Sequence, residues 1–281
     1  MGFRRTICLG VLVVLAACAT PTTNKPTYTQ DELRAEEEAQ SKAAMSAPLY
    51  FDAKKPYGYK QLDALDTRLK PVAERVRQAA SQLCQDLQKD EPPPEEPDEN
   101  NSCSFTISMD IHKRDLNAYA HGHIAVIYPA MVDFLKSDDQ LAFILSHEMA
   151  HDVMHHSDKK RHNAYFGAAI GLLADIAAGA ENVNSKGTFG NTGERAAVNA
   201  YSPQFEAEAD YVGLYIMARA GYNIDKAPDV WRIMSATNPD AIYVTTTHPN
   251  NSARTIAMTK TVAEIHAKQR AHQPLIPNIQ A

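Results

Sequence analysis

The sequence lacks three features, and each absence narrows the class of protein. It lacks an excess of positive charge, because its net charge is -6 over 281 residues, and nucleic acid is therefore not an expected partner. It lacks an uninterrupted apolar run of about 20 residues, the length that a helix needs to span a membrane. It also lacks an internal repeat of fixed period. The 44% of hydrophobic and 22% of charged residues are ordinary for a globular protein.

The apolar segment at the N-terminus is short and has the features of an export signal. Arg4 and Arg5 provide the positive charge, and residues 7–17 are an apolar stretch of 11 residues. The stretch ends in Leu-Ala-Ala-Cys, which resembles the lipobox of bacterial lipoproteins. We therefore expect a lipoprotein signal peptide over residues 1–17 and a diacylglycerol on the thiol of Cys18. A plain signal peptide with a chance cysteine at its end is the alternative.

The residue after Cys18 bears on the membrane to which the chain is tethered. In the sorting rule of bacterial lipoproteins, Asp at this place favours the inner membrane, so Ala19 favours the outer one. The expected location is therefore the periplasmic face of the outer membrane of a Gram-negative envelope.

Cysteine is scarce, and only Cys84 and Cys103 remain once Cys8 is removed with the signal and Cys18 carries the lipid. Because an exported chain meets an oxidising compartment, this pair predicts a disulfide. The bridge would staple the acidic, proline-rich run at 90–99, which cannot bury apolar surface and is expected to be solvated. Two unpaired buried thiols are the alternative.

The middle of the chain predicts an α+β fold that is mainly helical, with a small sheet. Apolar residues at three- and four-residue steps predict a helix over 60–89, interrupted near Pro71. Strands are expected at 104–109 and 123–128, with a turn-like segment at 117–122 before the second strand. Further helices are expected at 129–135, 138–156, 203–220, 227–236 and 252–270.

These elements and the composition divide the chain into four parts. After the signal peptide, residues 18–58 are expected to form a lipidated tether, with a helix over 31–45. The folded domain is placed at 59–270, and residues 182–193 predict a mobile loop within it. A proline-containing tail at 271–281 is expected to fray.

The segment from His147 to His151 reads His-Glu-Met-Ala-His and carries the central chemistry. On a helix, residues four apart lie about 40° apart around the axis, so both imidazoles point the same way and can bind one Zn²⁺. Glu148 is placed to take a proton from water as it attacks a carbonyl, and to return it to the leaving amine. Ser137 and Gln140 predict a capping box at the start of this helix. A coincidental surface helix is the alternative.

A catalytic zinc takes three protein ligands and one open position, and a later helix offers carboxylates. Glu206 and Asp210 are four residues apart and share a helix face. Glu208 lies about 200° from Glu206 around the axis, so both cannot point at the metal. A solvated carboxylate is the alternative for Glu206, and a plain helix salt bridge is the alternative for Asp210.

These segments resemble a gluzincin family that includes HtpX, the CAAX prenyl proteases and related bacterial envelope peptidases. The family carries HExxH and, one helix later, Glu-x-x-Ala-Asp, which is matched here within residues 201–213. The resemblance covers roughly residues 60–270, including Asn-Ala-Tyr-Ala at 117–120 and Thr-His-Pro at 247–249 with Arg254 beyond it. Pro203 stands where the family usually has Arg, which puts a local ion pair in doubt.

The resemblance implies a zincin-like metallopeptidase domain with one Zn²⁺ per chain. It implies that His147, His151 and Glu206 are the zinc ligands and that Glu148 is the catalytic carboxylate. It further implies that Asp210 holds a ligand histidine from behind by a hydrogen bond.

Other expectations concern the substrate and the remaining histidines. The strand at 123–128 would pair with substrate backbone as an added strand. His248 would stabilise the oxyanion or occupy the open zinc position, with an ordinary loop histidine as the alternative. His155 lies two helical turns from His147, so His147, His151 and His155 cannot all bind one ion. His156 is the next residue after His155. Both are interpreted as surface or packing residues.

The expected function is hydrolysis of internal peptide bonds in unfolded or misassembled envelope proteins, a quality-control role that the resemblance implies. The membrane is contacted through the N-terminal lipid. One alternative is a zinc-bearing chaperone or assembly factor with little proteolysis, and another is a lipoprotein scaffold with a structural metal.

Overall fold

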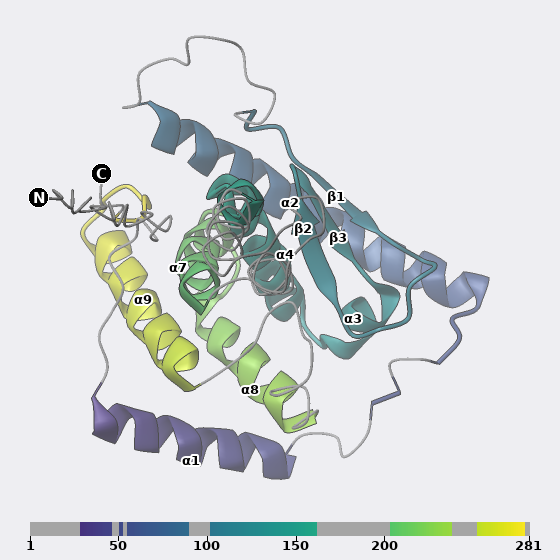
Figure 1. Ribbon diagram of the computed structural model, residues 1–281, viewed down its shortest axis with the longest axis horizontal. Coiled ribbons are helices and arrows are strands. Elements are labelled where there is room, and N and C mark those ends of the chain that lie inside the picture. The colour runs from purple at the N-terminus through teal and green to yellow at the C-terminus, as the bar shows by residue number, and fades with distance from the viewer. Residues whose placement is uncertain are drawn as a thin grey trace, which may run out of the picture.

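The structure is a computed structural model that describes residues 29–46, 51–52, 55–89, 102–161, 203–237 and 252–278. It is mainly helical with a small sheet, as the sequence predicts (Figure 1). The sheet has three strands. Cys18, His248, the acidic run at 90–99 and the loop at 182–193 lie outside the described residues. The elements, in chain order, are α1 Gln30–Ser46, α2 Tyr59–Gln88, β1 Thr106–Met109, β2 Ala118–His121, β3 Ile124–Ile127, α3 Pro129–Phe134, α4 Asp138–Val153, α7 Pro203–Arg219, the short 3-10 helix η2 Ile224–Lys226, α8 Ala227–Thr237 and α9 Ser252–Arg270.

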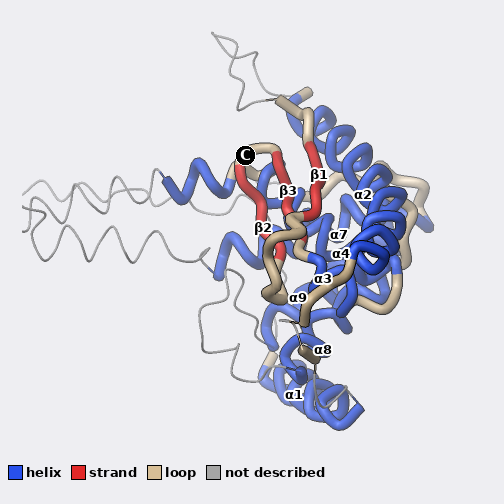
Figure 2. The backbone as a smooth tube through the Cα atoms, turned by 90° about the vertical axis from the view of Figure 1, so that its right-hand side faces the viewer, coloured by secondary structure: helices blue, strands red, loops and turns tan. Residues whose placement is uncertain are grey.

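The sheet has the strand order β1-β3-β2, so β3 is its central strand (Figure 2). β1 pairs with β3 in parallel, and β2 pairs with β3 antiparallel. Both edges of β3 are therefore occupied, and the expectation that residues 123–128 pair with a substrate strand is wrong.

The sequence interpretation missed β2, because residues 117–122 look like a turn. The chain reverses between β2 and β3 through only two residues, Gly122 and His123, whose φ angles are +51° and +71°. Positive φ at both central residues is the type I′ geometry that matches the twist of paired strands. Glycine adopts it freely, and histidine is among the few other residues enriched there. Such a short turn leaves room for a four-residue strand before it.

α2 runs without interruption for 30 residues, so the predicted break near Pro71 is wrong. The proline removes one backbone donor from the helix. Nevertheless, the residues on both sides of it bury the same face, and Leu69, Val72 and Val76 are at most 3% exposed. The packing of this face against α4 and α7 therefore outweighs the cost of one missing hydrogen bond.

A disulfide joins Cys84, near the end of α2, to Cys103, just before β1. It is the pair that the sequence predicts, with the two Cα atoms 5.6 Å apart. Cys84 is buried in the core. The bridge therefore ties the segment before β1 to α2, the longest of the described helices.

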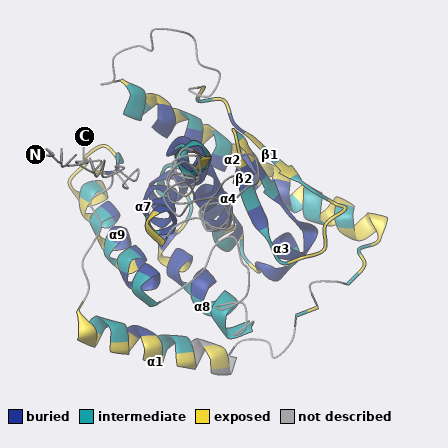
Figure 3. Ribbon diagram, viewed as in Figure 1, coloured by how far each residue is buried: buried dark blue, intermediate teal, exposed yellow. Residues whose placement is uncertain are grey.

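α4 is the buried central helix, and its N-terminus is capped as predicted. Ser137 Oγ accepts from the Gln140 backbone N–H at 3.2 Å, and Gln140 Oε1 accepts from the Ser137 backbone N–H at 3.2 Å. Every residue after the third is buried (Figure 3). The helix ends three residues earlier than predicted, because His155 takes a left-handed conformation with φ +52°. Residues 156–161 then form a new helical segment.

α7 packs closely along α4, and a glycine permits the approach. A Cβ atom at Gly213 would lie 3.1 Å from the backbone N and Cα of His147. Interiors are already close-packed, so any side chain here would push the two helices apart. The C-terminus of α7 ends at a glycine as predicted: Gly221 has φ +74°, and the Tyr222 N–H donates to the Met217 carbonyl at 3.2 Å.

α1 is part of the folded domain and not a free tether. It lies against α8 and α9 (Figure 1). Arg232 Nε and Nη2 donate to the two carboxylate oxygens of Glu36 at 2.9 and 2.6 Å, and Lys260 Nζ lies 2.9 Å from Glu32 Oε1. The predicted domain boundary at residue 59 therefore misses this helix. Ion pairs, and not a continuous apolar stripe, hold α1 against the domain, so its sequence does not look like that of a packed helix.

The chain after α9 folds back onto the domain. Asn278 N–H donates to the Tyr211 hydroxyl at 3.0 Å, and Lys268 Nζ donates to the Ile276 carbonyl at 2.5 Å. The predicted fraying is therefore wrong for residues 271–278. Within the described ranges, no helix combines the length and the apolar character that crossing a membrane requires.

Candidate active site

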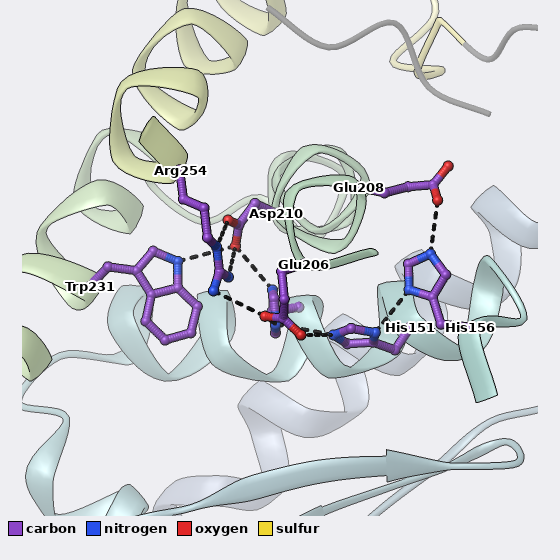
Figure 4. A network of polar contacts seen from close by, with 8 residues as sticks. His151, His156, Glu206, Glu208, Asp210, Trp231 and Arg254 are labelled. Carbon is purple, nitrogen blue, oxygen red and sulfur yellow. Dashed lines mark hydrogen bonds and ion pairs between the residues drawn. The ribbon is translucent and has the colours of Figure 1, made fainter. Parts of the chain in front are cut away.

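Three ligand groups from two helices converge at one buried point. His147 and His151 lie four residues apart on α4, and Glu206 lies in the first turn of α7. Figure 4 shows the His151 ring and the Glu206 carboxylate pointing toward one another. The two Nε2 atoms are 3.2 Å apart, and each lies 3.5 Å from a carboxylate oxygen of Glu206. All three side chains are fully buried. In the described part of the chain, this is the one group of His, Cys, Asp or Glu side chains close enough together to hold a metal ion.

The donor set and the local charge both fit a divalent metal ion. Two imidazoles and one carboxylate are the protein ligands of one class of catalytic zinc site. Glu148, Glu206 and Asp210 are at most 2% exposed, and Arg254 is a buried cation among them. Among the residues that the structure describes, these three buried carboxylates outnumber the one buried guanidinium beside them, and a divalent cation would offset negative charge there.

His147 is supported directly by a carboxylate. Its Nδ1 lies 3.1 Å from Asp210 Oδ1, and its Nε2 faces Glu206. Arg254 Nε and Nη2 donate to Asp210 at 2.7 and 2.9 Å, and Trp231 Nε1 donates to it at 3.1 Å. Burial lowers the pKa of His147, but the hydrogen bonds and charges of Asp210 and Glu206 outweigh burial and raise it to about 9. We call Asp210, Arg254 and Trp231 the Asp210 support.

Arg254 ties two carboxylates of the site together. Its Nη1 lies 3.0 Å from Glu206 Oε2, and its guanidinium carbon lies 4.7 Å from the centroid of the Trp231 ring, a cation–π contact. Burial raises the pKa of Asp210, but Arg254 and His147 outweigh it and hold the pKa below its ordinary value. The sequence interpretation gave Arg254 no role, because it lies 44 residues after Asp210 and only the packing of α9 on α7 joins them.

His151 is supported through a second histidine. Its Nδ1 lies 2.8 Å from His156 Nδ1, and His156 Nε2 lies 2.9 Å from Glu208 Oε2 (Figure 4). The His156 ring stacks on Phe205, with centroids 4.5 Å apart. We call His156 and Glu208 the His156 support. The prediction that His156 is a surface or packing residue is therefore incomplete: it is fully buried and hydrogen-bonds a candidate ligand.

The early end of α4 explains why the sequence did not reveal this contact. On a continuous helix, residue 156 would lie about 140° from His151 around the axis. The left-handed backbone of His155 breaks the helix and changes the direction of the chain. Backbone geometry, and not helical spacing, therefore brings His156 to His151.

Glu148 lies next to a second buried carboxyl group. It is 2% exposed, and Asp152, one turn later on α4, is 6% exposed. Burial raises the pKa of Asp152, and the negative charge of Glu148 raises it further, so that the pKa of Asp152 is about 8. The backbone N–H of His123 donates to the Asp152 carboxyl group, which acts in the opposite direction. This hydrogen bond fixes the turn between β2 and β3 to the C-terminal end of α4.

β2 contacts α4, and some of its main-chain N–H and C=O groups do not hydrogen-bond to β3. Tyr128 N–H donates to the Asn117 carbonyl at 3.1 Å, so these two residues form a hydrogen-bonded pair across the hairpin. Such pairs alternate in an antiparallel ladder, so the main-chain groups of Ala118 and Ala120 point away from β3. Among the strands that the structure describes, none pairs with this edge.

Two buried histidines on one helix meet a carboxylate from a helix packed against it, beside a small sheet. This arrangement is typical of the metallopeptidase class of proteins. Residues 96–262 match the model of peptidase family M48, and this match covers more than half of the chain. The chain therefore belongs to peptidase family M48, whose members are metal-dependent.

Several curated proteins are similar to this chain. Mitochondrial metalloendopeptidase OMA1 of Saccharomyces cerevisiae is 30% identical over 146 residues, which cover 50% of this chain and 41% of the relative. Metalloprotease LoiP of Escherichia coli is 28% identical over 109 residues, 38% of this chain and 43% of the relative. The beta-barrel assembly-enhancing protease of Escherichia coli is 26% identical over 127 residues, 42% of this chain and 26% of the relative. The chain thus spans less than half the length of each relative.

Proposed function

We propose that the protein is a zinc-dependent endopeptidase that hydrolyses misfolded or misassembled proteins of a bacterial envelope. The observation that carries the proposal is the convergence of ligand atoms of His147, His151 and Glu206 within 4.8 Å. Three protein ligands leave a position open for water or substrate, as in catalytic zinc sites and unlike closed structural ones. The metalloprotease names of the relatives support the same reaction.

Each residue of the site then has a chemical role. Nε2 of His147, Nε2 of His151 and the carboxylate of Glu206 would hold the ion. When bound, Zn²⁺ supplies a Lewis acid for the scissile carbonyl and lowers the pKa of water there to about 7. Glu148 would take the proton from the attacking water and return it to the leaving amine. Asp210 would accept the Nδ1–H of His147, so that Nε2 offers its lone pair.

The outer edge of β2 supports an extended chain as the substrate. Main-chain groups of Ala118 and Ala120 would pair with the backbone of an added strand. Backbone pairing tolerates many side chains, and an unfolded segment offers more unpaired backbone than a folded domain does. One relative is named a beta-barrel assembly-enhancing protease, which supports envelope proteins as the substrate class.

We place the enzyme at the outer membrane, on its periplasmic face, anchored by a lipid on Cys18. The Leu-Ala-Ala-Cys ending of the N-terminal apolar stretch and Ala19 support this location. The disulfide between Cys84 and Cys103 is in keeping with an oxidising compartment. Replacement of Cys18 by Ala should move the protein from the membrane fraction to the soluble fraction.

His248 is proposed either to stabilise the oxyanion of the tetrahedral intermediate or to occupy the open metal position in a resting enzyme. Its place in a Thr-His-Pro segment like that of the related peptidases supports a role at the site. A His248→Ala variant with unchanged turnover and unchanged metal content would remove both roles.

Casein degradation by the purified protein tests the proposed reaction. The wild type should degrade casein, a chelator should stop the degradation, and added Zn²⁺ should restore it. Glu148→Gln, which keeps the shape of the side chain, should bind zinc and be inactive. Degradation that continues in the chelator, or in Glu148→Gln, would overturn the proposal. If Glu148→Gln restored the assembly of envelope proteins as well as the wild type does, a chaperone that binds these proteins without cleaving them would be favoured.

A further inference from the structure

We infer that His156 and Glu208 form a relay that positions His151 for the metal ion, so that both are positioning residues of the site. The inference rests on the proposed metal centre. It begins from the two short contacts of the His156 support, which join His151 Nδ1 to His156 Nδ1 at 2.8 Å and His156 Nε2 to Glu208 Oε2 at 2.9 Å.

The geometry selects one order of hydrogen atoms along this chain. His151 faces His147 and Glu206 with Nε2, so Nε2 must offer its lone pair to the metal. The proton of the neutral His151 ring therefore lies on Nδ1 and is donated to His156 Nδ1. His156, which accepts on Nδ1, then carries its own proton on Nε2 and donates it to Glu208. The carboxylate, which only accepts when ionised, fixes the direction of both hydrogen bonds.

The relay is held by the helix that also supplies the third ligand. Phe205, which stacks on the His156 ring, and Glu208 lie on either side of Glu206 in α7. Both His156 and Glu208 are fully buried, so water does not compete for their hydrogen bonds. α7 thus orients His151 through the relay, just as it orients His147 through Asp210.

The test separates a hydrogen-bond role of His156 from a packing role. His156→Phe keeps a flat ring against Phe205 but cannot accept a hydrogen bond, whereas His156→Gln keeps an acceptor oxygen. The affinity of the full-length protein for Zn²⁺ is measured by competition with a chromophoric chelator. Loss of a residue that orients a metal ligand weakens binding by about 10–100-fold. We expect a loss of this order in His156→Phe, a smaller loss in His156→Gln and none in the control His112→Phe, at an exposed position.

Two further measurements keep the inference open to refutation if His156→Phe does not fold. Glu208→Gln preserves size and removes the charge, and it should weaken Zn²⁺ binding several-fold. In ¹⁵N-histidine spectra of the zinc-loaded protein, His151 should carry its proton on Nδ1 and His156 on Nε2. A His156 proton on Nδ1 would overturn the relay.

The outcomes distinguish the relay from the proposed function. Wild-type Zn²⁺ affinity in both His156→Phe and Glu208→Gln would overturn the relay while the chelator-sensitive degradation of casein by the wild type still stood. A wild-type protein that binds no Zn²⁺ would overturn both.

Discussion

The two candidate ligand histidines lie one turn apart on α4, yet they are held in different ways. His147 reaches a carboxylate directly, and that carboxylate is locked by side chains from α8 and α9. The Nδ1 atom of His151, on the side of the ring away from Glu206, reaches the Glu208 carboxylate through a second imidazole, that of His156. The Asp210 support contains a buried ion pair, so its loss should cost both stability and metal binding. The His156 support is a hydrogen-bond chain, so its loss should cost mainly metal binding.

The largest effect is expected at Glu206, the third candidate ligand. Its carboxylate faces both histidines, and Glu206→Gln replaces a charged ligand by a neutral amide. We expect Zn²⁺ affinity to fall by more than the about 100-fold that marks the upper range for a residue behind a ligand. Casein degradation should fall to background. Chelator competition and casein assays measure the two effects, and wild-type metal content in this variant would contradict the ligand assignment.

The comparison between the supports is tested most directly by Asp210→Asn beside Glu208→Gln. Asp210→Asn leaves Arg254 buried without one of its two carboxylate contacts. Breaking a buried ion pair costs about 3–5 kcal/mol, whereas disrupting a buried hydrogen bond costs about 1–3 kcal/mol. Urea unfolding of the two metal-free variants should therefore show the larger loss of stability for Asp210→Asn. Equal losses would remove the distinction between the supports.

Gly213→Ala should affect both supports alike. The added methyl group would lie 3.1 Å from backbone atoms of His147, and backbone cannot move aside as a flexible side chain can. Overpacking of this kind costs about 1–3 kcal/mol. Because α7 would move as a unit, the contacts of Glu208 with His156 and of Asp210 with His147 should loosen together. Thermal unfolding and Zn²⁺ titration of this variant measure both effects, and unchanged stability with unchanged affinity would show that the helices tolerate a wider spacing.

The smallest effect is expected at the other end of α7, where Arg219 pairs with Asp86 of α2. Lys89 and Arg219 hold the pKa of the Asp86 carboxyl below its ordinary value. Its stabilising contribution is therefore complete above that ordinary value and is lost as the pH falls through the lowered pKa. Asp86→Asn should cost about 0–1 kcal/mol at neutral pH and leave Zn²⁺ affinity unchanged.

Unfolding of wild type and Asp86→Asn across a range of acidic pH checks this expectation. The difference in stability between the two proteins should shrink as the medium becomes more acidic. A difference that stays constant with pH would contradict it. A fall in Zn²⁺ affinity would show that general loss of stability reaches the metal site, and the comparison of the two supports would then need correction for it.

The residues that the sequence placed together are those whose relation is local. A spacing of four on a helix brings His147 beside His151, and Glu206 into line with Asp210, before any tertiary contact is known. A resemblance of motifs then joins the two helices. The structure brings His147, His151 and Glu206 within reach of one ion.

The contacts that the sequence could not supply depend on where elements end and on what packs from elsewhere. His156 reaches His151 because His155 adopts a left-handed conformation without the glycine that usually marks such a place. Arg254 reaches the site from a helix 44 residues beyond Asp210. The central position of β3 depends on β2, a strand of four residues hidden before a two-residue turn. The periodicity of apolar residues in the sequence predicts none of these three contacts.

The bridge between Cys84 and Cys103 has a consequence for how damage to this protein would look. A peptide bond cut anywhere between the two cysteines would leave both fragments covalently joined. His147, His151 and Glu206 all follow Cys103, so the severed chain would keep its whole ligand set on one fragment. A nicked molecule would therefore run with the intact one on a gel until a reductant is added, and only then separate into two bands.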